Sequence, residues 1–195
     1  MEDNETITWI IANSGWDYED ECQFREVAED IGVGITFIGN KNTLIDYINN
    51  KYKGNEKTRH LDRITNFVVF SHGLAKEDGV ISLGYNGNLV YDTNFDIDKN
   101  DIVSSIYATA FNNPLSFFYS CNTGTSGENS FAQAWVNKFK GVTWAFKGKS
   151  DYGKIGSGFH PFDTLSRKWN DFSHYGSANY PTADNNASLL AFIPK

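Results

Sequence analysis

The chain has 195 residues, of which 40% are hydrophobic and 15% aromatic, and its net charge is -7. This length suits one α/β domain with a core rich in aromatic side chains. The acidic balance argues against a protein that binds the phosphate backbone of nucleic acids, because such a protein needs a basic face. It is compatible with basic substrates.

The N-terminus and the cysteines predict a cytoplasmic protein without a membrane association. The first six residues are acidic and polar, unlike the basic and apolar regions of a signal peptide. No apolar run approaches the roughly 20 residues needed to cross a bilayer. Cys22 and Cys121 are too few for a disulfide framework, so both thiols are expected to be free. A domain excised from a larger secreted toxin has the same features, and that alternative stays open.

The first 70 residues alternate between strand and helix patterns. Short β-branched or apolar runs predict strands over 6–12, 35–38 and 66–70. Apolar spacings of three and four residues predict helices over 17–31 and 44–52 between them. This order is typical of a parallel, doubly wound sheet with right-handed crossovers.

A different pattern begins after residue 79. Asn86-Gly87 lies between the apolar runs 80–85 and 88–91 and predicts an antiparallel hairpin beside the sheet. Asp98 then caps a predicted helix that ends before Pro114. The remaining predicted elements are strands over 115–119, 142–146 and 188–193, a helix over 129–139 and a short helix around 164–172.

These patterns predict one domain over 1–195. Its α/β core spans 1–147, and a loop-rich C-terminal part, 148–195, packs on the core. The predicted fold class is α/β, with a mostly parallel central sheet and a small antiparallel hairpin insertion.

Two of the predicted strands end in residues whose chemistry is complementary. Strand 66–70 runs into His72, and strand 115–119 runs into Cys121. Catalytic groups of parallel α/β sheets gather beyond the carboxyl ends of the strands. A thiolate attacks a carbonyl carbon, and an imidazole protonates the leaving amine. The backbone N–H groups of Gly73 and Cys121 are candidates for an oxyanion hole.

Each of these residues also has an ordinary structural explanation. A cysteine at a strand end is more often a small buried residue, and a His-Gly pair is more often a turn. The pair is more specific, because both strand ends, their order, their spacing and the fold pattern agree.

The two motifs resemble those of the caspase-like cysteine peptidases (clan CD), which include caspases, metacaspases, clostripain and the self-cleaving domains of clostridial toxins. That family shares a hydrophobic strand ending in His-Gly and a later one ending in a small residue and Cys. Phe70-Ser71-His72-Gly73 and Tyr119-Ser120-Cys121-Asn122-Thr123-Gly124 fit this pattern. His72 precedes Cys121 by 49 residues, close to the caspase spacing. The resemblance covers about residues 6–147.

The resemblance implies a three-layer α/β/α sandwich and a cysteine endopeptidase. His72 corresponds to the general acid and Cys121 to the nucleophile. The implied partner is a protein or peptide substrate, with no metal and no organic cofactor. Two other functions stay open: a caspase-like or flavodoxin-like domain that binds a partner without catalysis, and a non-proteolytic thiol acyl-transfer enzyme. The oligomeric state is left open.

The substrate pocket is expected at the ends of the first, fourth and fifth strands of the core. Metacaspases and clostripain-like enzymes carry an Asp two residues before the Cys, where this chain has Tyr119. A preference for basic side chains therefore loses its main support. The candidates allow an acidic or an apolar pocket and are Ser14, Trp16, Asp17, Tyr119, Phe146 and Asp151.

No metal site is predicted. His160 and His174 have no second ligand at metal spacing. A cluster of aspartates has spacings unlike the twelve-residue calcium loop, which favours a solvated loop and a helix cap. The cluster comprises Asp92, Asp96, Asp98 and Asp101.

Overall fold

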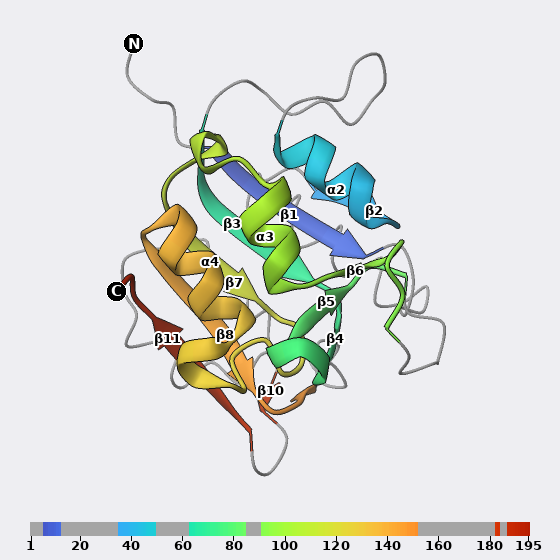
Figure 1. Cartoon of the computed structure of the whole chain (residues 1–195), viewed down its shortest axis with the longest axis vertical. Coiled ribbons are helices and arrows are strands. Elements are labelled where there is room, and N and C mark those ends of the chain that lie inside the picture. The colour runs from blue at the N-terminus through green and yellow to red at the C-terminus, as the bar shows by residue number, and fades with distance from the viewer. Residues whose placement is uncertain (1–5, 13–34, 50–62, 85–90, 152–181, 184–186) are drawn as a thin grey trace, which may run out of the picture.

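The computed structural model describes residues 6–12, 35–49, 63–84, 91–151, 182–183 and 187–195. Their centre is a six-stranded sheet in the order β11-β8-β7-β3-β1-β2 (Figure 1). All neighbouring pairs are parallel except β11 and β8. The prediction of a mostly parallel α/β sheet is confirmed. The strands are β1 (Thr6–Ala12), β2 (Ile35–Ile38), β3 (Ile64–Phe70), β7 (Phe111–Phe118), β8 (Val142–Lys147) and β11 (Ser188–Phe192).

The described helices cover one face of this sheet (Figure 1). They are α2 (Lys41–Ile48), α3 (Lys99–Ser105) and α4 (Phe131–Phe139). Their apolar residues join one core cluster with alternate strand residues such as Phe67 and Val69. The predicted helix over 129–139 is confirmed, and aromatic side chains recur along it every four residues: the rings of Phe131 and Trp135 lie 6.3 Å apart, and those of Trp135 and Phe139 lie 4.5 Å apart.

The opposite face of the sheet is also buried. Strand residues alternate between faces, so Phe70, Phe117 and Tyr119 point away from the helix-covered side. The Phe70 and Tyr119 rings stack at 5.0 Å, and the Phe117 and Tyr119 rings at 6.0 Å. These three side chains are at most 3% exposed, so this face is buried as fully as the helix-covered one. The predicted helices over 17–31 and around 164–172 lie outside the described residues.

A small antiparallel sheet follows β3 directly, so the predicted antiparallel insertion is confirmed, but the run at 80–82 does not pair with the predicted run at 88–91. Its strands are β4 (His72–Leu74), β5 (Val80–Ser82) and β6 (Asp96–Ile97). The run at 80–82 therefore pairs with His72–Leu74 on one side and Asp96–Ile97 on the other. The Asn86-Gly87 turn lies outside the described residues. Elsewhere, β9 (Ser150–Asp151) pairs with β10 (Thr182–Ala183).

The predicted helix after Asp98 is too long. The helix α3 ends at Ser105, a 3₁₀ turn, η2, covers Ala108–Ala110, and β7 already begins at Phe111. Pro114 does not prevent strand pairing, because the register between β3 and β7 shifts between Ile64 and Asn66. The extra residues of β7 form an irregularity there, which is where a strand tolerates proline.

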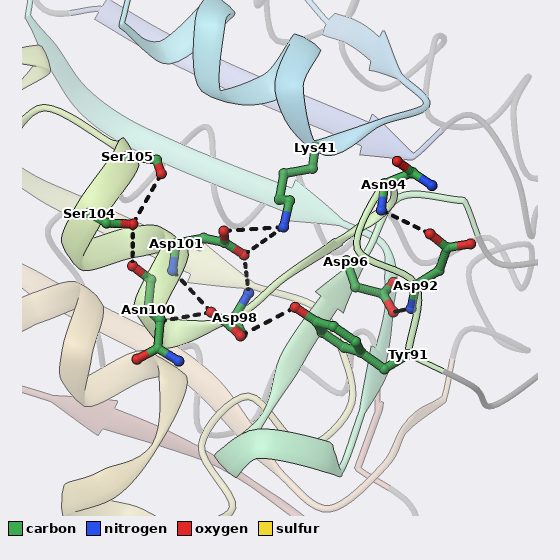
Figure 2. A network of polar contacts seen from close by, with 10 residues as sticks. All are labelled: Lys41, Tyr91, Asp92, Asn94, Asp96, Asp98, Asn100, Asp101, Ser104 and Ser105. Atoms are coloured by element: carbon green, nitrogen blue, oxygen red, sulfur yellow. Dashed lines mark hydrogen bonds and ion pairs between the residues drawn. The ribbon is translucent and has the colours of Figure 1, made fainter.

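The acidic segment before α3 is used for helix capping and ion pairing (Figure 2). Asp98 caps α3, as the sequence predicts, and also forms a capping box with Asp101. Asp101 also accepts hydrogen bonds from the Lys41 ammonium at 3.1 Å. The carboxylates of Asp92 and Asp96 accept backbone N–H groups of Asn94 and Asp92. These partners explain the cluster without a cation.

Among the described residues, no helix is both long and apolar enough to cross a membrane.

Candidate active site

The ends of β3 and β7 lie side by side. The two strands pair in parallel up to Val69 and Phe118, so the chain leaves both at the same edge of the sheet. The Tyr119 N–H continues the pairing by donating to the Val69 carbonyl at 3.0 Å. One residue further, the hydroxyls of Ser71 and Ser120 lie 2.7 Å apart, fully buried. The expected juxtaposition of the two strand ends is confirmed.

Gly73 brings the strand that carries His72 against the backbone of Cys121. A Cβ atom on Gly73 would lie 2.0 Å from the Cys121 carbonyl oxygen and 2.6 Å from its nitrogen. Real Cβ atoms do not approach backbone atoms so closely, so this position requires glycine for space. The strand after His72 therefore rests directly on the cysteine.

A second close contact lies at the other end of the turn between β4 and β5. Gly79 has a φ of 104°, and its Cβ would lie 2.6 Å from the Asn122 carbonyl oxygen. Between the glycines, the 3₁₀ turn η1 (Lys76–Asp78) carries Asp78, whose carboxylate pairs with Lys99 of α3. Hydrogen bonds from Lys99 and then Ser126 lower the pKa of Asp78. Through Lys99 and Ser126, the turn is therefore bonded to residues that precede and follow Cys121 in the sequence.

The loop after Cys121 is held by its backbone. Asn122 adopts a φ of 63°, and its N–H donates to the Gly148 carbonyl at 2.7 Å. The Gly124 N–H donates to the Phe146 carbonyl at 2.8 Å. A short 3₁₀ turn, η3 (Gly127–Asn129), then leads to α4, which Ser130 caps. Within the described part of the chain the N–H of Cys121 donates to no acceptor.

The Cys121 sulfur is half-buried, forms no disulfide and contacts Ser150. The Ser150 N–H donates to the sulfur at 3.3 Å, and the Ser150 hydroxyl lies 3.4 Å from it. The Ser150 carbonyl is 3.8 Å from the sulfur and suits the S–H form. Ser150 thus offers an acceptor for a thiol, a backbone donor for a thiolate, and a hydroxyl proton shared between the sulfur and the Tyr119 carbonyl, which accepts from it at 3.4 Å. Donors of this kind stabilise the charged sulfur.

A cavity of about 530 Å³ lies where these elements meet. Both His72 and Cys121 line it. The other described lining residues come from the turn after β4, the cysteine loop and the connection after β8: Gly73, Leu74, Ala75, Lys76, Asn122 and Lys149. A cavity of this size suits a side chain or a short peptide.

The predicted pocket residues have different positions. Tyr119 and Phe146 are 3% and 1% exposed and belong to the stacked aromatic face of the sheet. They are not among the described residues that line the cavity. Asp151 lies in β9, next to Ser150, whereas Ser14, Trp16 and Asp17 lie outside the described residues. A role in a substrate pocket stays a prediction for all of them.

Sequence reasoning missed Ser150, Lys76 and Lys149. Position 150 has no local motif, and it reaches Cys121 across 29 residues through the pairing of β8 with β7. The one available signal was that the end of β8 belongs to the same sheet edge as the ends of β3 and β7.

Within the described ranges, no three His, Cys, Asp or Glu side chains gather as a metal site would require. No family model, no curated protein and no solved structure matches the chain.

Proposed function

We propose that the protein is a cysteine endopeptidase that acts through His72 and Cys121. The observation that supports it most is the cavity of about 530 Å³ that both residues line, at the adjoining ends of β3 and β7. A histidine and a cysteine that reach one cavity from two neighbouring strands have the arrangement of a nucleophile and its acid–base partner.

The proposed reaction proceeds in two steps. The Cys121 sulfur attacks the carbonyl carbon of the scissile peptide bond, and the oxyanion accepts hydrogen bonds from the N–H groups of Gly73 and Cys121. The His72 imidazolium gives its proton to the departing nitrogen, so the C–N bond breaks and a thioester remains. A water molecule, deprotonated by His72, then attacks the thioester carbonyl, and the C–S bond breaks to release the carboxylic acid and the Cys121 thiolate beside the His72 imidazolium.

The proposal includes a caspase-like three-layer arrangement of the fold. The burial of both sheet faces supports it, because α2, α3 and α4 cover only one of them. The small sheet formed by β4, β5 and β6 is the antiparallel insertion of this arrangement.

Covalent labelling tests the proposed nucleophile. A peptide-like electrophile, such as an acyloxymethyl ketone, is incubated with the protein, and the modified residue is identified by mass spectrometry. We expect modification at Cys121, and a loss of about 100-fold or more in labelling rate for His72→Ala. Cys22→Ala serves as the control, since Cys22 is the other cysteine of the chain. Equal labelling of Cys22 and Cys121, or labelling indifferent to His72, would contradict the proposal.

A further inference from the structure

The described lining of the cavity differs in charge from the chain as a whole. The protein carries a net charge of -7. The lining side chains that the structure describes include Lys76, Lys149 and His72 and no aspartate or glutamate, and the side chains of Glu77 and Asp151 are outside that description. An acidic protein that gathers cations around one cavity creates a local field favouring anions there.

Both lysines are tied to the candidate nucleophile by the backbone. Lys76 begins the turn η1, three residues after Gly73, which packs on the Cys121 backbone. Lys149 directly precedes Ser150, whose N–H donates to the Cys121 sulfur at 3.3 Å. The two lysines therefore follow β3 and β8, the strands on either side of β7 in the sheet.

These lysines differ from others that the fold uses structurally. Lys41 pairs with Asp101, and Lys99 with Asp78. Lys138 donates to the carbonyls of Ile102 and Val103 at the end of α3. In contrast, neither Lys76 nor Lys149 pairs with a carboxylate among the side chains that the structure describes, which do not include those of Glu77 and Asp151. The Lys76 ammonium lies 4.7 Å above the Tyr91 ring, which holds the charge near the cavity without neutralising it.

We propose that the substrate is an acidic peptide, with an aspartate or glutamate side chain close to the scissile bond held between Lys76 and Lys149. This inference rests on the proposed peptidase function and narrows it. An exposed ion pair changes an equilibrium constant by up to about fivefold. Two such pairs predict a preference of about tenfold for Asp over Asn, which shrinks in 1 M salt because screening then acts within about 3 Å.

The test uses matched peptides that differ only by Asp or Asn at one position within three residues of the cleaved bond. Hydrolysis is measured for the wild type, and binding for Cys121→Ala, where no turnover occurs. We expect the acidic peptides to be favoured in both measurements. K76E and K149E are each expected to lower the Asp-to-Asn ratio at least threefold, and the double variant to reverse it.

K147E is the matched control, because Lys147 is exposed, lies two residues from Lys149 and does not line the described cavity. The Asp-to-Asn ratio of K147E is expected to equal that of the wild type. Equal binding of acidic and neutral peptides, or a ratio that K147E changes as much as K149E, overturns this inference. Acid-selective binding without hydrolysis by the wild type supports the inference and refutes the peptidase.

Discussion

The hydroxyl oxygens of Ser71 and Ser120 lie 2.7 Å apart and are fully buried between the ends of β3 and β7. They directly precede His72 and Cys121. The Ser71 hydroxyl also contacts the His72 carbonyl at 3.1 Å. This buried pair fixes the two strand ends to one another at the last position before the candidate catalytic residues.

Removing the Ser71 hydroxyl is expected to destabilise the protein more than removing the Ser120 hydroxyl. Ser71→Ala leaves the Ser120 hydroxyl buried without its partner and should cost about 2 kcal/mol of unfolding free energy. Ser120→Ala should cost about 1 kcal/mol, because the Ser71 hydroxyl still donates a hydrogen bond to the His72 carbonyl in this variant. Urea unfolding of both variants and of the double variant measures the coupling. Strictly additive losses would show that the two hydroxyls do not interact.

Gly73→Ala is expected to abolish labelling of Cys121 or to slow it at least tenfold, since the new Cβ would overlap the Cys121 backbone. Gly127→Ala is the control. A Cβ on Gly127 meets nothing within 4 Å, although its φ of 55° adds strain of about 1 kcal/mol. If both variants label Cys121 at the rate of the wild type, the close contact at Gly73 is not needed for the site.

Ser150→Ala tests the contact with the sulfur. The variant keeps the backbone N–H and loses the hydroxyl 3.4 Å from the Cys121 sulfur. We expect iodoacetamide to modify Cys121 about three to ten times more slowly at pH 7, because a charge-assisted hydrogen bond to the thiolate is lost. Ser150→Thr retains a hydroxyl and should recover most of the rate. A wild-type rate in Ser150→Ala would assign Ser150 no influence on the nucleophile.

The raised pKa of Tyr91 predicts a loss of stability at high pH. Its burial, followed by the charges of Asp98 and Asp101, raises its pKa to about 12 from 10.0. A folded-state pKa above the unfolded value contributes stability that is complete below about pH 10 and is lost as the pH rises toward 12. Unfolding in urea across this window should show a steeper decline for the wild type than for Tyr91→Phe. Parallel declines would contradict this assignment.

The sheet was predictable because each of its strands is a short apolar run bounded by turn residues. The juxtaposition of His72 and Cys121 was predictable for a related reason: parallel strands end at one edge, and both residues follow such ends. The start of β7 was not predictable, because Asn112-Asn113-Pro114 is locally typical of a break between elements. Only pairing with β3 across an irregularity makes Phe111 part of the strand.

The surroundings of the cysteine were less accessible from the sequence. Ser150 contacts the sulfur only because β8 pairs with β7 and its extension turns back toward Cys121. The lysines at the cavity likewise have no spacing that links them: Lys76 and Lys149 meet there through tertiary structure. Local patterns predict which strand ends carry chemistry, whereas side-chain partners depend on how loops from distant parts of the chain pack.

The most direct test of the account is cleavage of a diverse peptide mixture, with products identified by mass spectrometry, for the wild type, Cys121→Ala, His72→Ala and Cys22→Ala. The account predicts peptide-bond hydrolysis by the wild type and by Cys22→Ala, and none above background for the other two, provided all four fold alike by circular dichroism. Cleavage by Cys121→Ala at the wild-type rate would contradict it.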